Sequence, residues 1–311
     1  MRKFLKFCLS CLPEITAGKI NSDIAVIRKR REAEYSDRIF PLDKDLIPGE
    51  NITFIHSGNI GDILFSLYFC KELSHALGLE KFNFHIRTGD GSNVLQLTAG
   101  AAEFLLPLLK VQPFIDNVTF GETTENISNR FDLDQFRELP LNPCAGQIQN
   151  WYYHLSSRHL PREFWKPVLE VKPDDRFKDK IILISTPRYQ NPFVDLKALE
   201  RFKERFVFTG LPEEHSMFQK RYFQLEYFPA STMLEIACCM AGAAGVIGNQ
   251  SGLYTIAECL KVPRILIAPA FVMNNGRLER GPHNNQVQGG WGEDVSTTSR
   301  LTAMTAELFR Q

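Results

Sequence analysis

The sequence has no excess of charge of either sign and no long apolar run. Its 36 lysine and arginine residues equal its 36 aspartate and glutamate residues, so the net charge gives no argument for a nucleic-acid partner. No apolar run reaches the roughly 18–20 residues that a membrane-spanning helix requires. We therefore expect a soluble protein that does not bind nucleic acid. Its 311 residues are enough for one large domain or two ordinary ones.

Two further patterns are missing: a cysteine framework for disulfides and a dinucleotide fingerprint. The seven cysteines are not spaced like those of a secreted disulfide-rich protein, and Cys70, Cys238 and Cys259 fall in predicted helices. This favours reduced, buried thiols and a cytoplasmic location. Cys8 and Cys11 have the spacing of metal ligands, but no second pair completes a site, so we expect no metal. Without a GxGxxG pattern, the sequence gives no support for a nicotinamide or flavin cofactor.

The most informative stretch is residues 245–267, whose pattern predicts a strand, a polar turn, a helix and a second strand. Ser251 is suited to cap the helix, and Pro263 ends it. Two strands joined in this way predict a parallel sheet buried on both faces, which binds ligands at the carboxyl ends of its strands. The N–H groups at the start of the helix favour a phosphate, although an ordinary capped turn gives the same pattern.

A similar strand, loop and helix is predicted over residues 52–73. Gly58 and Gly61 in the loop allow the backbone to turn sharply and to approach a ligand closely. Asp62 follows near the helix N-terminus, where the helix dipole favours its ionised form. From this segment alone, Asp62 is either a functional carboxylate or a residue that caps the helix.

Strands and helices alternate on both sides of residues 161–178, a charged segment with three prolines that we interpret as a linker. We therefore predict an N-terminal extension at 1–48, an α/β domain at 49–165, and a second α/β domain at 166–311 that closes with a helix. Residues 121–145 are expected to be irregular. The other elements expected are strands at 82–87, 117–120, 180–185 and 205–209, and helices at 100–110, 147–158, 194–202, 231–241 and 297–309, with one more beginning at Pro212.

The N-terminal extension is basic at its start and again at residues 28–31, which are all arginine or lysine. A segment of this kind can contact an anionic membrane surface, so one expectation is peripheral membrane contact through residues 1–31. The simpler alternative is the solvated face of a helix that ends near Glu34.

Three patches of the chain resemble one enzyme family. Residues 56–67 (HSGNIGDILFSL) and 248–263 (GNQSGLYTIAECLKVP) are similar to the N-terminal and donor motifs of the ADP-heptose:lipopolysaccharide heptosyltransferases of glycosyltransferase family 9. Residues 209–214 resemble that family's glycine-and-glutamate turn. The resemblance implies a GT-B fold, that is, two Rossmann-like domains with a cleft between them. It also implies transfer of a sugar from a nucleotide-diphosphate-sugar to a glycan or glycolipid acceptor, with inversion at the anomeric carbon and without a metal or cofactor.

The same resemblance assigns roles to individual residues. Asp62 matches the family's general base, which would accept the proton of the attacking hydroxyl. Arg188 matches a basic residue that would neutralise the departing diphosphate, and Glu214 matches a carboxylate on the donor side. Ser251 and Gly252 match residues at the donor phosphates. The other donor-side residues are Gly210, Asn249 and Gln250, and the cleft loop comprises Ser57, Gly58, Asn59 and Gly61.

The sequence departs from the family pattern at two donor positions. Gln250 stands where the family has aspartate and Thr255 where it commonly has histidine, so each change removes an ionisable group. Gln250 can still hydrogen-bond a hydroxyl, but it cannot act as an acid or base. Two alternatives therefore stay open: a catalytically silent nucleotide-sugar or glycan-binding protein, and a nucleotide-sugar epimerase that needs no acceptor.

Overall fold

The computed structural model describes most of the chain between residues 42 and 308. The expected membrane contact through residues 1–31 lies outside the described residues, and so does Arg188. The described ranges are 42–47, 49–92, 96–139, 148–187, 190–191, 194–267, 293–294 and 298–308.

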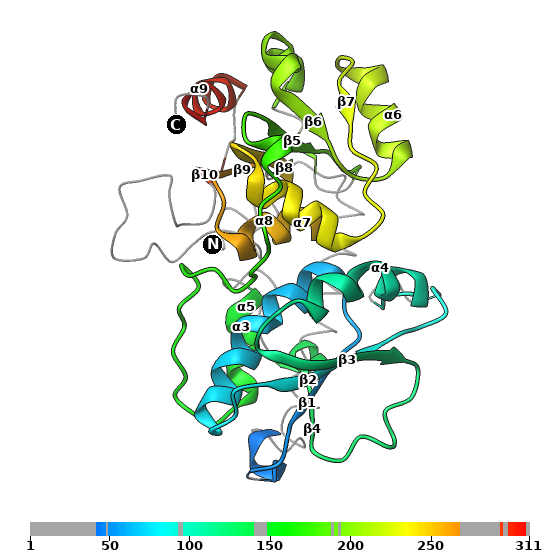
Figure 1. The fold of residues 1–311 in the computed structure, drawn as a ribbon, viewed down its shortest axis with the longest axis vertical. Helices are drawn as coiled ribbons and strands as arrows, with labels where there is room; N and C mark the ends of the chain where they lie inside the picture. Colours follow the sequence, from blue (N-terminus) through cyan, green and yellow to red (C-terminus); the bar gives the residue numbers. More distant parts are fainter. Residues whose placement is uncertain are drawn as a thin grey trace, which may run out of the picture.

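Before residue 140, the described strands form one parallel sheet in the order β3-β2-β1-β4 (Figure 1). Strand β4 corrects the expectation that residues 121–145 are irregular. It has three residues and buries only Phe131, so it is too short to give an alternating pattern in the sequence. The elements of this part are β1 (Thr53–His56), β2 (Phe82–Arg87), β3 (Ile115–Gly121), β4 (Arg130–Asp132), α3 (Ile60–Ala76), α4 (Ala99–Lys110) and α5 (Ile148–Tyr152).

The described strands after residue 180 form a second parallel sheet in the order β10-β9-β8-β5-β6-β7. The predicted strand–turn–helix–strand at 245–267 is confirmed as β8, α8 and β9, and every residue of both strands is buried. The elements are β5 (Ile181–Ile184), β6 (Phe206–Phe208), β7 (Glu226–Tyr227), β8 (Gly245–Asn249), β9 (Arg264–Ile267), β10 (Glu293–Asp294), α6 (Pro212–Arg221), α7 (Met233–Gly242), α8 (Gly252–Leu260) and α9 (Thr298–Leu308).

Two predicted α-helices take other forms. The segment expected to be helical at 194–202 is a 3₁₀ helix, η5 (Leu196–Arg205). It buries Leu196 and Leu199, which are three residues apart, and a three-residue turn places such a pair on one face. The helix expected at 147–158 ends early, because α5 gives way to a 3₁₀ turn. The 3₁₀ helices besides η5 are η1 (Leu42–Asp45), η2 (Leu133–Glu138), η3 (Tyr153–Leu155) and η4 (Asp175–Phe177).

Helices connect the two sheets. Helix α3 packs against α8, and α4 packs against α7, so these four helices occupy the space between the sheets in Figure 1. One cluster of buried apolar side chains runs across this junction, from Phe69 on α3 to Ala257 on α8. The boundary between domains at residue 165 stays a prediction. Within the described part of the chain, every helix is too short or too polar to cross a membrane.

Candidate active site

A cavity of about 1120 Å³ lies where the carboxyl ends of strands from both sheets face each other. The first sheet contributes the start of α3 together with Arg137 of η2. The second contributes the ends of β5 and β6 and the turn after β8. The polar and glycine residues of its wall include Asn59, Gly61, Asp62, Arg137, Thr186, Thr209, Gly210, Glu214, Gln250, Ser251, Gly252 and Thr255.

The N-termini of α3 and α8 meet at the cavity wall. A Cβ atom on Gly252 would lie 3.1 Å from Cβ of Ile60, and one on Gly61 would lie 3.0 Å from Oγ1 of Thr255. The two glycines therefore allow the helix ends to approach closely. Each helix N-terminus carries roughly half a positive elementary charge, so both favour an anion in the cavity. Ser251 caps α8 as expected, because its hydroxyl accepts a hydrogen bond from the Tyr254 amide at 3.2 Å.

The end of β8 and the turn after it carry two polar side chains with different surroundings: one bonds to the end of β5, and the other lines the cavity. Asn249 is buried behind the wall, where its side-chain Oδ1 accepts from the Thr186 amide at 3.0 Å and its Nδ2 donates to the Thr186 carbonyl at 2.8 Å. Asn249 thus joins β8 to the end of β5. The next residue, Gln250, lines the cavity, and its buried Oε1 has no hydrogen-bond partner among the described residues. The same holds for the buried hydroxyl of Thr209 at the end of β6.

Glu214 also lines the cavity, from the first turn of α6. Its Oε2 accepts a hydrogen bond from the Leu211 amide at 3.0 Å. Burial raises the pKa of Glu214, while that hydrogen bond partly opposes the rise. Gly210 has a φ of +149°, and a Cβ atom there would lie 2.7 Å from Glu214 Oε2, so only glycine fits without displacing the carboxylate.

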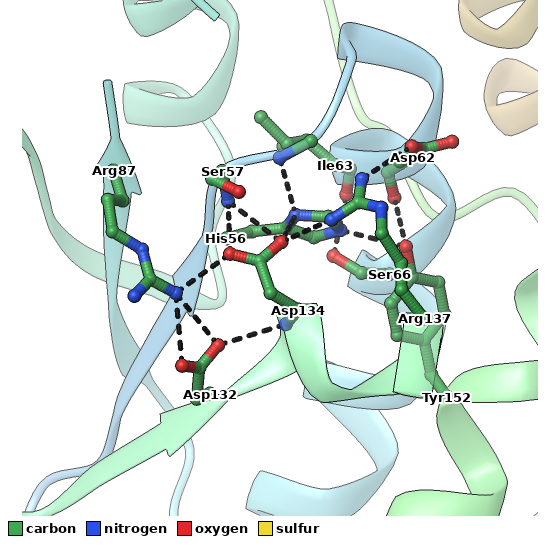
Figure 2. Close-up of polar contacts among 11 residues, drawn as sticks. His56, Ser57, Asp62, Ile63, Ser66, Arg87, Asp132, Asp134, Arg137 and Tyr152 are labelled. Carbon is green, nitrogen blue, oxygen red and sulfur yellow. Dashed lines mark hydrogen bonds and ion pairs between the residues drawn. The ribbon is translucent and has the colours of Figure 1, made fainter. Parts of the chain in front are cut away.

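Asp62 is held by an ion pair that the sequence did not predict. The N-cap residue of α3 is Asn59, so Asp62 does not have the capping role that was its simpler interpretation. Its Oδ2 lies 3.0 Å from Nη2 of Arg137, and the two side chains are 21% and 22% exposed, respectively. Nη1 of the same guanidinium lies 2.6 Å from Oδ1 of Asp134 (Figure 2). One arginine therefore bridges two carboxylates.

Asp134 contacts several of the polar groups near Asp62. It accepts the Ser57 amide at 2.9 Å, and it lies 2.8 Å from Nη2 of Arg87 and 3.1 Å from Nδ1 of His56 (Figure 2). Burial works against its ionisation, but the contacts with His56, Ser57 and Arg137 hold the pKa of Asp134 well below its ordinary value. Asp134 is therefore a carboxylate at any pH near neutral.

A second set of contacts fixes the backbone of Asp62. The Tyr152 hydroxyl donates to the Asp62 carbonyl at 3.0 Å and lies 2.8 Å from Nε2 of His56. Burial raises the pKa of Tyr152 far above its ordinary value, so this phenol stays protonated. Gly58 is required beside these groups, because a Cβ atom there would lie 2.4 Å from Nη2 of Arg137 and 2.5 Å from Cε1 of His56.

The structure brings most of the predicted site residues together. Asn59, Gly61, Asp62, Gly210, Glu214, Gln250, Ser251 and Gly252 line one cavity. Ser57, Gly58 and Asn249 lie outside its wall and support it through the contacts given above. Arg137, Asp134 and Tyr152 were not predicted. The signal for Arg137 in the sequence is weak, since it lies 75 residues from Asp62 in a segment without clear periodicity.

Two parallel sheets joined through helices, with a cavity at their facing carboxyl ends, give the chain the fold of the heptosyltransferase-like enzymes of glycosyltransferase family 9. The glycosyl transferase family 9 from Veillonella parvula DSM 2008 superposes with a TM-score of 0.52 at 12% identity, covering 85% of this chain and 91% of that chain. E. coli ADP-heptose lps heptosyltransferase II superposes with a TM-score of 0.55 at 13% identity, covering 84% of this chain and 99% of that one.

A third similar structure is the dodecameric iron-containing heptosyltransferase TibC in complex with ADP-D-beta-D-heptose. It has a TM-score of 0.52 and 11% identity, with 86% of this chain and 77% of that chain covered. At these identities the likeness establishes the fold. No protein-family model and no curated protein matches the sequence.

Proposed function

We propose that this protein is a GT-B glycosyltransferase that moves a sugar from a nucleotide-diphosphate-sugar to a hydroxyl of a glycan or glycolipid acceptor. The observation that carries the proposal is the cavity itself. It places a carboxylate, Asp62, and the N-terminus of α8 on one wall, in a fold whose similar structures are glycosyltransferases. These are the two kinds of group that the transfer reaction needs.

In the proposed step, the acceptor hydroxyl attacks the anomeric carbon and its proton passes to Asp62. The new oxygen–carbon bond forms as the bond from the anomeric carbon to the diphosphate breaks, and the diphosphate leaves with the bonding electrons. A direct displacement of this kind inverts the anomeric carbon. A positioned carboxylate typically contributes 10²–10⁴-fold as a general base. The proposal needs no metal, although one similar structure is described as iron-containing.

On the proposed donor side of the cavity, the groups that would bind the nucleotide-sugar are uncharged hydrogen-bonding groups. The first-turn amides of α8, at Gly252 and Leu253, lie at the cavity wall and suit the diphosphate. The buried Oε1 of Gln250 lacks a partner among the described residues, so a sugar or ribose hydroxyl that donates to it would satisfy it. Arg188 stays a predicted counter-charge for the diphosphate.

The first test measures binding and turnover separately. Thermal stability is recorded with ADP, UDP, GDP and CDP, because a ligand at a hundred times its dissociation constant stabilises by about 2.7 kcal/mol. Release of nucleoside diphosphate is then followed with ADP-, UDP- and GDP-sugars, with octyl glycosides as acceptor probes and with EDTA in a parallel series. Asp62→Asn is expected to lower turnover by about 10²–10⁴-fold and to keep nucleotide binding. Asp90→Asn, an exposed carboxylate outside the cavity wall, is the control.

The outcomes separate the proposal from its alternatives. Nucleotide binding without turnover in the unaltered protein would favour a silent binding protein. Conversion of the donor sugar without an acceptor and without release of diphosphate would favour an epimerase. Stabilisation by none of the nucleotides would refute the donor site. Turnover that EDTA abolishes and iron restores would refute the metal-independent chemistry.

A further inference from the structure

The polar groups around Asp62 form a closed ring of contacts (Figure 2). From His56 the ring passes to Asp134, Arg137, Asp62 and Tyr152 and returns to His56. Asp62 is held in this ring at two points. Tyr152 fixes its backbone carbonyl, and Arg137 fixes one oxygen of its carboxylate.

Arg137 is itself tightly constrained. Its two terminal nitrogens contact different carboxylates, and its guanidinium carbon lies 4.6 Å from the centre of the Phe136 ring. The second carboxylate that Arg137 contacts, Asp134, is held in place by the Ser57 amide and by Arg87. Since a guanidinium is planar and rigid, fixing one nitrogen on Asp134 determines where the other nitrogen lies. Asp134 therefore sets the position of the cation that Asp62 meets.

We propose that Arg137, oriented by Asp134, is the positioning residue that aims the Asp62 carboxylate at the acceptor hydroxyl. This inference rests on the proposed function, since it assigns Asp62 as the base. Arg137 contacts one oxygen of Asp62, at 3.0 Å, and that carboxylate remains 21% exposed at the cavity wall. Arg137 is the one cationic side chain in the described part of that wall.

Alignment of a reacting group governs rate more than affinity. A displacement of about 1 Å in a catalytic group can cost on the order of 100-fold in rate. Loss of Arg137 should therefore lower kcat, while nucleotide binding, which we assign to the first-turn amides of α8, is retained. Asp134→Asn should act in the same direction, and the two changes should not add, because they act through one contact.

The experiment compares Arg137→Met, Arg137→Lys, Arg137→Ala, Asp134→Asn and the double variant Arg137→Met/Asp134→Asn. The matched control is Arg176→Met, which breaks an arginine–aspartate pair at 2.6 Å on the surface, where Arg176 is 73% exposed. Turnover of the best nucleotide-sugar and the thermal shift with its nucleoside diphosphate are measured for each. We expect Arg137→Met to lose on the order of 100-fold in kcat. Arg137→Lys should lose less, and added guanidinium ion should partly restore Arg137→Ala, whose short side chain leaves space for the ion.

Three results would overturn the inference. The first is a kcat in Arg137→Met within threefold of the control. The second is a loss in Arg137→Met that appears in nucleotide affinity instead of kcat. The third is a loss that neither lysine nor guanidinium ion relieves, since that would indicate a structural role.

A stability measurement separates this inference from the proposed function. If the unaltered protein turns over no donor, the proposed function fails. The contact itself is then tested by the melting temperatures of Asp62→Asn, Arg137→Met and their double variant. A double-variant loss smaller than the sum of the single losses shows that the two side chains are coupled, whereas an exact sum overturns the inference that Arg137 holds Asp62 in position.

Discussion

Replacing Glu258 with glutamine should strongly destabilise the protein. Glu258 and Arg264 have fully buried side chains and Lys261 is 6% exposed, so the three form an ionic cluster inside the fold. Oε2 of Glu258 accepts from Nε and Nη2 of Arg264 at 2.7 and 2.5 Å, while Oε1 pairs with Lys261. Burial lowers the pKa of Lys261. Burial also works against the charge of Arg264, but the contacts of Arg264 together, with Glu258 first among them, raise its pKa.

The size of the expected loss of stability follows from the buried charges that Glu258→Gln leaves without a partner. Removing one partner of a buried ion pair typically costs about 3–5 kcal/mol, because a desolvated charge remains uncompensated. Glu258→Gln keeps the volume and leaves two buried cations facing a neutral amide. At about 2–4 °C per kcal/mol, the melting temperature should fall by roughly 6 °C or more. The control is Glu226→Gln, which removes the 59%-exposed partner of Lys180 and should cost at most about 1 kcal/mol.

The pH dependence provides a second check on the same variant. A lysine whose folded pKa is lower than its unfolded pKa destabilises the folded state while it is charged, and the penalty shrinks as the pH rises towards the unfolded value near 10.4. In Glu258→Gln, loss of a proton from Lys261 removes one of the two uncompensated positive charges. The gap in melting temperature between variant and unaltered protein should therefore narrow from pH 7 to pH 9. A variant that melts within 2 °C of the unaltered protein at pH 7 would refute the cluster's role.

Two further predictions concern stability. Gly242→Ala should cost about 1–3 kcal/mol, because its Cβ would lie 2.1 Å from the Asp174 carbonyl oxygen, whereas Gly100→Ala, with nothing within 4 Å, should be neutral or stabilising in the same denaturation assay. Asp134→Asn should flatten the loss of stability below pH 4. The folded pKa of Asp134 is well below the unfolded value near 3.9, so this group stabilises above pH 4 and loses that contribution at about 1.4 kcal/mol per pH unit as the pH falls. An unchanged acid profile of the melting temperature in Asp134→Asn would contradict this reasoning.

The sequence predicted structure where the residues that determine it are adjacent in the chain, and it did not predict contacts between distant residues. The unit at 245–267 was predictable because its buried strands, its cap at Ser251 and its terminating Pro263 are all adjacent in the chain. The Arg137–Asp62 pair was not, because 75 residues separate its members. Strand β4 and helix η2, which bring Arg137 to the site, are short and carry few buried residues. Their position comes from pairing with β1, which no local pattern indicates.

The structure also changes the meaning of the two departures from the family pattern. Thr255 packs over Gly61 at the junction of α3 and α8, and its hydroxyl donates to the Ser251 carbonyl at 3.2 Å, so it belongs to the contact between helices. Gln250 instead presents a buried acceptor to the cavity. Neither position carries a titratable group, which leaves Asp62 and Glu214 as the carboxylates of the described wall. Of these, Asp62 has its carboxylate paired with Arg137 and its backbone carbonyl bonded by Tyr152, which gives the proposed general base a fixed position from which to meet an acceptor hydroxyl.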